Sequence, residues 1–215
     1  MENKLKGLLF DLDGVLVNTE INHFQSWKSI AEELNVAFDE KFNESLKGLS
    51  RADSLKTILT QNSLELNDEQ FSSLLQLKNT YYLESIKNLN EENILPGVMD
   101  LIREAKAKKI KLGVGSSSKN ARTILKRIGL TKYFDVIVDG NDVVLPKPHP
   151  EVFEKGARAL QLSPKEIIVF EDAQSGVEAA KCGGFRVFGV GNMELMELMP
   201  FFLKDLTEFR LTDYA

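Results

Sequence analysis

Beyond residue 94, short apolar runs alternate with amphipathic stretches, and this alternation restricts the chain to very few folds. We predict strands at 110–114, 136–138, 167–170 and 186–190, and helices at 96–108, 118–129, 150–161 and 176–182. Alternating strands and helices build parallel sheets that carry helices on both faces. Together with one more apolar strand near the N-terminus, this pattern predicts an α/β fold with a doubly wound, Rossmann-like parallel sheet.

The N-terminal apolar run, residues 8–10, leads into two carboxylates, Asp11 and Asp13, and then Gly14. Residues two apart in a strand share a face, so both acids emerge where the sheet stops. Two acids on one face repel each other and bury badly, which favours a metal site or a reaction site. A carboxylate beside Mg²⁺ can attack phosphorus, and a second one can move a proton. Taken alone, the motif also fits a solvated strand end that turns at Asp13-Gly14.

Three further polar motifs follow predicted strands. Ser116 ends the apolar run 110–115, and Glu171-Asp172 end the run 167–170. Lys147 lies between two prolines that stiffen its backbone, although a lone lysine in such a loop is usually just solvated. All of these motifs lie at or just beyond the carboxyl ends of predicted strands, where open α/β sheets bind their ligands.

In this order, the motifs resemble those of the haloacid dehalogenase superfamily of phosphotransferases. The resemblance implies that Asp11 is the nucleophile that forms an aspartyl phosphate and that Asp13 is the general acid and base. Ser116 and Lys147 would bind the transferring phosphoryl group by hydrogen bond and by charge. The cofactor would be Mg²⁺, which prefers oxygen ligands, so neither histidine is needed. Its ligands would be Asp11, the backbone carbonyl of Asp13, Asp172 and, directly or through water, Glu171.

Residues 17–91 break the alternation, because they show helical periodicity and no convincing strand. We predict an inserted all-helical cap domain over 17–91, joined to a catalytic core of residues 1–16 and 92–215 by two crossings that act as a hinge.

Three basic residues of this cap are candidates for the cleft. Arg51 follows Ser50, a predicted helix N-cap, and opposes the helix dipole there, so it would bind a phosphate that is not transferred or simply lie exposed. Lys78 and His23 lie on apolar stripes, where lysines usually snorkel and histidines are usually satisfied core residues. Two such polar residues on faces directed at the core also fit a role in the cleft.

Nearly the whole chain is similar to the β-phosphoglucomutase family, most specifically in the cap segments 18–28, 46–54 and 78–79 and in the core loop 116–120. In that family an aspartyl phosphate exchanges phosphate with a sugar through a bound β-glucose 1,6-bisphosphate that turns around. The resemblance implies that Thr19, His23 and Lys78 hold Asp13 in register with cap closure. It implies a sugar pocket lined by Trp27 and the loop 48–54, with Gly48, Leu49, Ser50 and Ser54. It also implies phosphate contacts from Arg51 and the loop 116–120, with Ser117, Ser118, Lys119 and Asn120. Asn18 departs from the family, where Asp is common, and removes a charge at the hinge.

Composition restricts the partners. The net charge of −5, with no basic block, argues against general nucleic-acid binding and favours a small molecule. No apolar run approaches the roughly 20 residues that cross a membrane, so we expect a cytoplasmic protein. We also expect it to act as a monomer. Cys182 is the only cysteine, which excludes an internal disulfide, and we expect it to be a small packed residue at a helix end.

The expected reaction converts β-glucose 1-phosphate into glucose 6-phosphate. The main alternative is a phosphatase that acts on sugar or polyol phosphates, with the same chemistry at Asp11 but water as the acceptor. A catalytically silent sugar-phosphate sensor is a third reading, but it should lose a carboxylate, and this chain keeps all four.

Overall fold

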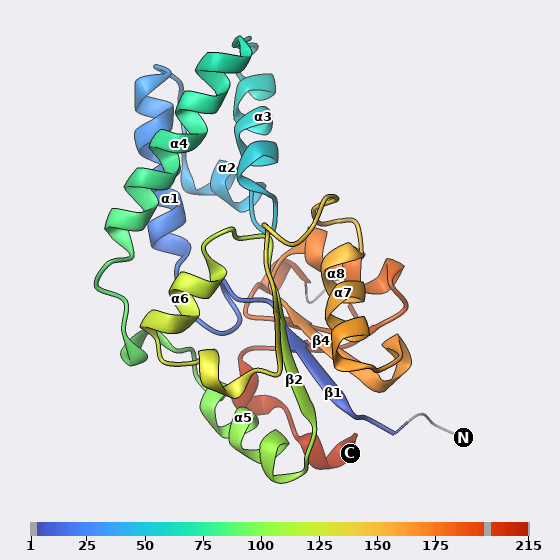
Figure 1. Ribbon diagram of the computed structural model, residues 1–215. Helices are drawn as coiled ribbons and strands as arrows, with labels where there is room; N and C mark the ends of the chain where they lie inside the picture. The colour runs from blue at the N-terminus through green and yellow to red at the C-terminus, as the bar shows by residue number, and fades with distance from the viewer. Residues whose placement is uncertain (1–3, 196–198, 215) are drawn as a thin grey trace.

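The computed structural model describes residues 4–195 and 199–214. Its core is a sheet of six parallel strands in the order β3-β2-β1-β4-β5-β6. The strands are β1 (Gly7–Phe10), β2 (Lys111–Gly115), β3 (Val136–Val138), β4 (Ile167–Glu171), β5 (Arg186–Val190) and β6 (Phe202–Leu203). The order reverses at β1, so the predicted doubly wound sheet is confirmed, and β1 lies at its centre (Figure 1).

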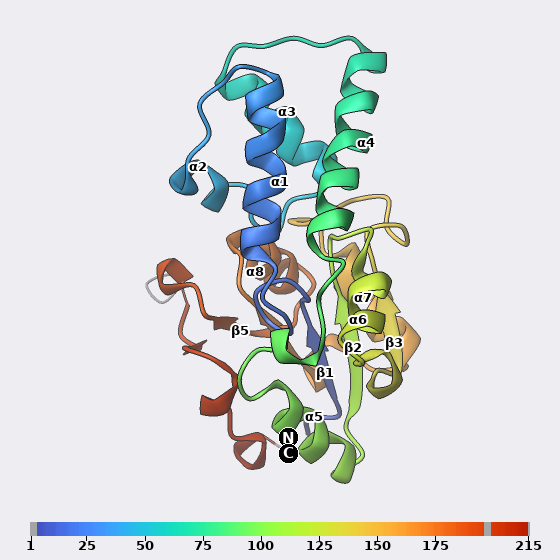
Figure 2. The ribbon, with the colours of Figure 1, turned by 90° about the vertical axis from the view of Figure 1, so that its left-hand side faces the viewer.

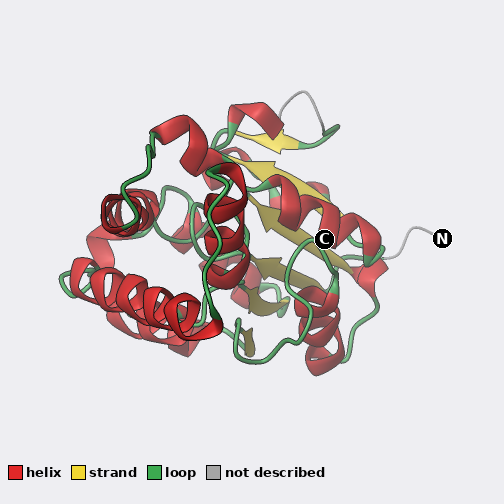
Figure 3. Ribbon diagram, turned by 90° about the horizontal axis from the view of Figure 1, so that it is seen from above, coloured by secondary structure: helices red, strands yellow, loops and turns green. Residues whose placement is uncertain are grey.

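Helices cover both faces of this sheet, as Figure 3 shows from above. The helices of the core are α5 (Val98–Ala107), α6 (Ala121–Arg127), α7 (Glu151–Leu160) and α8 (Gln174–Cys182). Side chains of β1 alternate between the two faces: Leu8 and Phe10 pack in one apolar cluster with α5 and α6, and Leu9 packs in the other with α7 and α8. Such two-sided burial explains why the strand reads as a continuous apolar run.

The predicted helical segment forms α1 (Glu20–Glu33), α2 (Glu40–Glu44), α3 (Arg51–Gln61) and α4 (Asp68–Ser85). These helices stand together beyond one end of the sheet (Figures 1 and 2). They share an apolar cluster of their own, with Trp27, Ile30, Leu55 and Ile58 buried in it. The chain passes between this bundle and the sheet at two adjacent places, where Val17 bridges Ile94.

Two local expectations are wrong. The helix predicted from residue 118 begins later, because Asn120 is the N-cap of α6 and the Ser118 hydroxyl accepts a hydrogen bond from the Asn120 amide. Cys182 lies at the end of α8 as expected, but it is exposed rather than packed, because it is not part of the apolar cluster that α8 joins. In the described part of the chain, no helix is long and apolar enough to span a membrane.

Candidate active site

An acidic cluster lies at the carboxyl ends of β1 and β4. One oxygen from each of Asp11, Glu171 and Asp172 lies within 4.8 Å of the others, and all three residues are buried. Burying three carboxylates together is costly unless a cation neutralises them. The donor set consists of carboxylate oxygens only, which is the chemistry that Mg²⁺ prefers. The cluster therefore fits a divalent metal of this kind.

Gly14 is required beside this cluster. Its φ is +84°, and a Cβ at this position would lie 2.2 Å from an oxygen of Asp172. Any side chain there would be strained and would collide with the acidic cluster. The glycine of the Asp-x-Asp-Gly motif thus lets the loop after β1 pass close to the end of β4.

Lys147 provides a fixed positive charge behind the cluster. Its Nζ donates to Asp11 Oδ1 at 2.5 Å and to Glu171 Oε2 at 2.7 Å, and its side chain is fully buried. Although burial alone would lower it, the charges of Asp11 and Glu171 raise the pKa of Lys147, so the ammonium is retained. Its hydrogen bonds to Asp11 and Glu171 fix the positions of these two carboxylates.

Burial and neighbouring acids perturb the carboxylates themselves. Burial raises the pKa of Asp11 to about 8, with Lys147 opposing the shift and Glu171 adding to it. Burial and the charge of Glu171 also raise the pKa of Asp172 well above its ordinary value. A bound divalent cation would favour the ionised forms of both residues. Perturbed acids of this kind are typical of functional sites.

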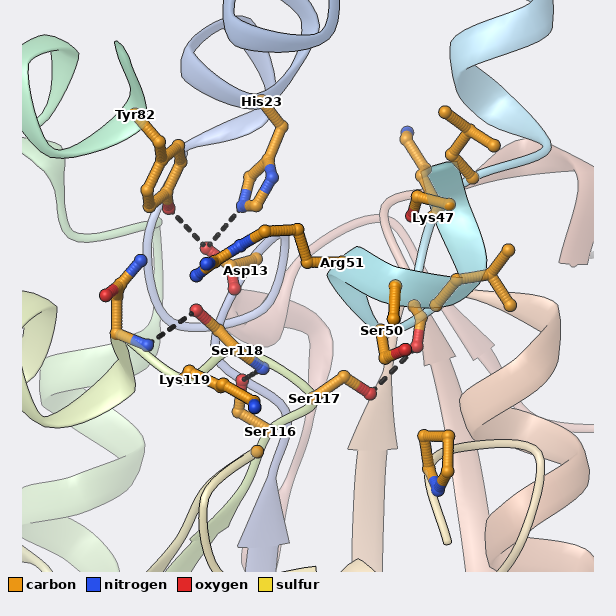
Figure 4. Close-up of a pocket in the computed structure, with 18 of the residues that line it drawn as sticks. Asp13, His23, Lys47, Ser50, Arg51, Tyr82, Ser116, Ser117, Ser118 and Lys119 are labelled. Carbon is orange, nitrogen blue, oxygen red and sulfur yellow. Dashed lines mark hydrogen bonds and ion pairs between the residues drawn. The ribbon is translucent and has the colours of Figure 1, made fainter. Parts of the chain in front are cut away.

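Asp13 points away from the acidic cluster and toward the helical bundle. Its Oδ1 accepts a hydrogen bond from the Thr19 hydroxyl and a longer one, 3.4 Å, from the Tyr82 hydroxyl. His23 Nε2 lies 3.6 Å from the same oxygen (Figure 4). Burial alone would raise the pKa of Asp13, but His23 and Thr19 outweigh it and hold the pKa below its ordinary value. Contacts from α1 and α4 therefore fix the position and the charge of this carboxylate.

Lys78 lies behind His23 in an aromatic setting. Its Nζ is 3.2 Å from His23 Nδ1 and lies over the rings of Trp27 and Tyr82, at 4.9 and 4.6 Å from their centroids. Burial and the nearby charge of Arg51 lower the pKa of Lys78 to about 7. The predicted alternative of a snorkelling lysine is wrong, because the side chain is buried and its nitrogen contacts other site residues.

Arg51 extends from the start of α3 toward the side of the pocket where Asp13 and Ser118 lie (Figure 4). The Ser50 hydroxyl accepts from the Asp53 amide, which confirms the predicted N-cap. Arg51 Nη2 donates to Asn79 Oδ1 at 2.8 Å, and the same oxygen accepts from Asn120 Nδ2 at 2.9 Å. Asn79 thus joins a cation of the bundle to the loop that follows β2.

The loop after β2 is braced from the next strand. Gly140 donates its backbone amide to the Ser118 carbonyl, and the Asn141 side chain donates to the Lys119 carbonyl at 3.0 Å. The Ser116 hydroxyl accepts from the Ser118 amide at 3.0 Å. These bonds hold the loop in a compact turn that faces the helical bundle.

A cavity of about 310 Å³ lies between the sheet and the bundle, a volume suited to a small ligand. Most of the predicted site residues line it: Asp11, Asp13, His23, Trp27, Gly48, Leu49, Ser50, Arg51, Ser54, Lys78, Ser116, Ser117, Ser118, Lys119, Asn120 and Asp172. Thr19, Lys147 and Glu171 lie behind this wall, and each contacts a residue that lines it or the acidic cluster. Asn18 is exposed at the crossing, where its amide donates to the Asn93 carbonyl.

Sequence reasoning missed several residues of the cavity. Tyr82 lines the cavity, but its spacing in the sequence is that of an apolar stripe of the cap. Its position one helical turn after Lys78, on the same side of the helix, was the signal for it. Glu20 and Lys47 also line the cavity, and their side chains form an ion pair of 2.7 Å. Their positions next to Thr19 and Gly48, two predicted site residues, were the available signal.

A buried lysine that contacts an acidic cluster at the switch point of an α/β sheet is the arrangement that a phosphoryl-transfer site uses. The sequence profile of the haloacid dehalogenase-like hydrolases matches residues 8–190, and the chain belongs to this family.

Similar proteins agree with this assignment. A β-phosphoglucomutase of Bacillus subtilis is 39% identical over 89% of this chain and 86% of its own length. A phosphorylated carbohydrates phosphatase of Thermotoga maritima is 34% identical, over 86% of this chain and 85% of its own. The crystal structure of a β-phosphoglucomutase from Clostridium difficile superimposes with a TM-score of 0.92 at 34% identity, covering 97% of this chain and 95% of that one.

Proposed function

We propose that the protein is a β-phosphoglucomutase, interconverting β-D-glucose 1-phosphate and glucose 6-phosphate through an aspartyl phosphate and a β-glucose 1,6-bisphosphate. The observation that carries this proposal is the presence of two cations at one cavity, Lys147 behind the wall that the sheet forms and Arg51 in the lining from the bundle. Lys147 contacts Asp11 at the sheet, and Arg51 enters from the bundle. A sugar bisphosphate needs a cation at each end, because each phosphate is an anion.

The proposed chemistry uses two carboxylates. Asp11 attacks phosphorus, and its Lys147 partner neutralises charge on the phosphoryl oxygens. Asp13 gives a proton to the departing sugar oxygen and takes one from the attacking hydroxyl. Ser116 supplies a hydroxyl to the phosphoryl group. Substrate contacts are assigned to His23, Trp27, Gly48, Leu49, Ser50, Arg51, Ser54, Lys78, Ser117, Ser118, Lys119 and Asn120.

The proposed cofactor is Mg²⁺, held by Asp11, Asp172 and the backbone carbonyl of Asp13, with Glu171 direct or through water. When bound, it neutralises charge on the phosphoryl group and on the attacking carboxylate. The residues of the acidic cluster fit this role because they supply only oxygen ligands.

The proposed cap domain comprises residues 17–91, and residues 1–16 and 92–215 form the catalytic core. Thr19, His23 and Lys78 link the cap to Asp13, so closing the cap places the acid and base. All walls of the cavity come from one chain, which supports activity as a monomer. A cytoplasmic location stays a prediction from the sequence.

The test is an assay with β-glucose 1-phosphate, its α anomer and Mg²⁺, primed by a catalytic amount of glucose 1,6-bisphosphate. We expect glucose 6-phosphate from the β anomer only. Release of inorganic phosphate without isomerisation would contradict the mutase and favour a sugar- or polyol-phosphate phosphatase. The similarity to the Thermotoga phosphatase supports that second candidate, in which water takes the place of the sugar as acceptor.

A further inference from the structure

The backbone at Lys47 and Gly48 joins the helical bundle to the sheet domain on two sides. The Ser117 hydroxyl, from the loop after β2, donates to the Gly48 carbonyl at 2.8 Å. On the other side, the Ser175 hydroxyl of α8 donates to the Lys47 carbonyl at 3.4 Å. We call this junction the Gly48 contact. Figure 4 shows the bond from Ser117 reaching the bundle chain beside Ser50.

Gly48 fits this junction closely. Its φ is +72°, and a Cβ would lie 2.3 Å from Ser175 Oγ and 2.8 Å from Ala173 Cβ. The backbone can approach α8 only because no side chain intervenes. Lys47 anchors the same segment to the bundle, with Nζ at 2.7 Å from Glu20 and 2.9 Å from Glu44. The segment is therefore fixed to both domains at once.

This geometry changes the role expected for Ser117. The resemblance assigned the Ser117 hydroxyl to a phosphate, but in the structure this hydroxyl donates to the Gly48 carbonyl of the bundle. Ser117 and Gly48 both line the cavity, so their bond closes its wall between the two domains. Ser117 is half-buried there, and the hydrogen bond is neutral.

We propose that Ser117 is a positioning residue, whose bond to Gly48 keeps water from replacing the sugar as phosphoryl acceptor; this rests on the proposed mutase function. In the transfer step, an acceptor oxygen bonds to phosphorus while the bond from phosphorus to the Asp11 carboxylate breaks. The proton of the acceptor passes to Asp13. Water can enter the same step and yield inorganic phosphate. An open wall beside the bound sugar admits that water, and the Gly48 contact keeps the wall closed.

The test compares two acceptors in one experiment. Enzyme phosphorylated at Asp11 is mixed with saturating glucose 6-phosphate, and inorganic phosphate and glucose 1,6-bisphosphate are quantified together. Losing one neutral hydrogen bond should raise the ratio of phosphate release to sugar transfer about two- to tenfold in Ser117→Ala. Ser175→Ala, which loses the longer bond, should raise it less. Ser72→Ala, an exposed serine of α4, is the matched control and should leave the ratio unchanged.

A second measurement does not depend on catalysis. Hydrogen exchange of the backbone amides at 46–50 should be faster in Ser117→Ala than in the wild type and in Ser72→Ala. Unchanged exchange would overturn the Gly48 contact. Faster exchange with an unchanged ratio, or an equal loss of transfer and hydrolysis, would overturn the positioning role and return Ser117 to phosphate binding. A wild type that transfers no phosphate to sugar would contradict the mutase, while the exchange result would still decide the contact.

Discussion

At the scale of single residues, the site depends on which groups keep their charge when they are buried. Lys147 keeps its proton because two carboxylates contact it directly. Lys78 is equally buried, but its nitrogen meets a histidine and two aromatic rings rather than a carboxylate. Burial and the nearby charge of Arg51 therefore lower the pKa of Lys78 to about 7, whereas the pKa of Lys147 is raised.

A pH dependence of stability follows for Lys78. Between pH 7 and 10.5 the unfolded chain holds a proton at this lysine and the folded chain does not, so the contribution of Lys78 to the free energy of unfolding rises with pH. The slope is at most about 1.4 kcal/mol per pH unit. In the folded protein, the pKa of His23 is lowered, that of Tyr82 is raised, Arg51 stays charged and the pKa of Asp13 is lowered, so none of these neighbours of Lys78 changes charge between pH 7 and pH 10.

Urea unfolding of the wild type and Lys78→Met, between pH 7 and pH 10, measures this effect. We expect the wild type to gain stability relative to the variant as the pH rises. A difference that stays constant would show that Lys78 is charged in the folded protein throughout this range.

At the scale of elements, the sequence predicted the sheet well because its strands are buried on both faces and end in polar motifs. The residues that meet across domains were harder to predict. Tyr82 has the spacing of a core aromatic on α4, and only the packing of α4 over Asp13 gives its hydroxyl a function. The partner of Ser117 depends on where Gly48 lies, which no local pattern encodes. The start of α6 at Asn120 also depends on distant residues. Gly140 and Asn141 donate hydrogen bonds to the Ser118 and Lys119 carbonyls and so fix the loop before the helix.

The two cations belong to different elements, and this separates their effects. In the proposed reaction, Arg51 of α3 binds the distal phosphate, and Lys147 of the loop before α7 binds the transferring one. A charged hydrogen bond to phosphate contributes about 1.5–3 kcal/mol, so Arg51→Ala should lower mutase turnover roughly ten- to a hundredfold.

Acetyl phosphate provides the control, because it carries no distal phosphate. Phosphorylation of Asp11 by this donor should change little in Arg51→Ala and should fall in Lys147→Ala, as measured by the rate of phosphoenzyme formation. Equal losses with the sugar and with acetyl phosphate in Arg51→Ala would indicate that Arg51 supports the fold or the chemistry instead.

At the scale of the whole molecule, the acidic cluster connects strands that are neighbours in the sheet but distant in sequence. Asp11 follows β1 and Asp172 follows β4, and repulsion among the buried carboxylates opposes folding until a proton or a cation neutralises it. A ligand that binds only the folded state stabilises it by mass action, by about 2.7 kcal/mol at a hundred times its Kd. Mg²⁺ should therefore raise the Tm of the wild type as its concentration rises.

For Asp172→Asn we expect a higher Tm without metal and a smaller rise in Tm with Mg²⁺ than for the wild type. Removing one buried charge relieves repulsion, so we expect this variant to unfold at a higher temperature than the wild type when EDTA is present. It also removes a ligand, so the rise in Tm with added Mg²⁺ should be much smaller. Thermal unfolding at neutral pH, with EDTA and then with increasing Mg²⁺, measures both effects in one series, and Glu178→Gln, an exposed residue of α8, is the matched control. The same Mg²⁺-dependent rise in the wild type and in Asp172→Asn would place the metal elsewhere, because a buried cluster that loses one of its three carboxylates cannot hold a divalent cation equally well.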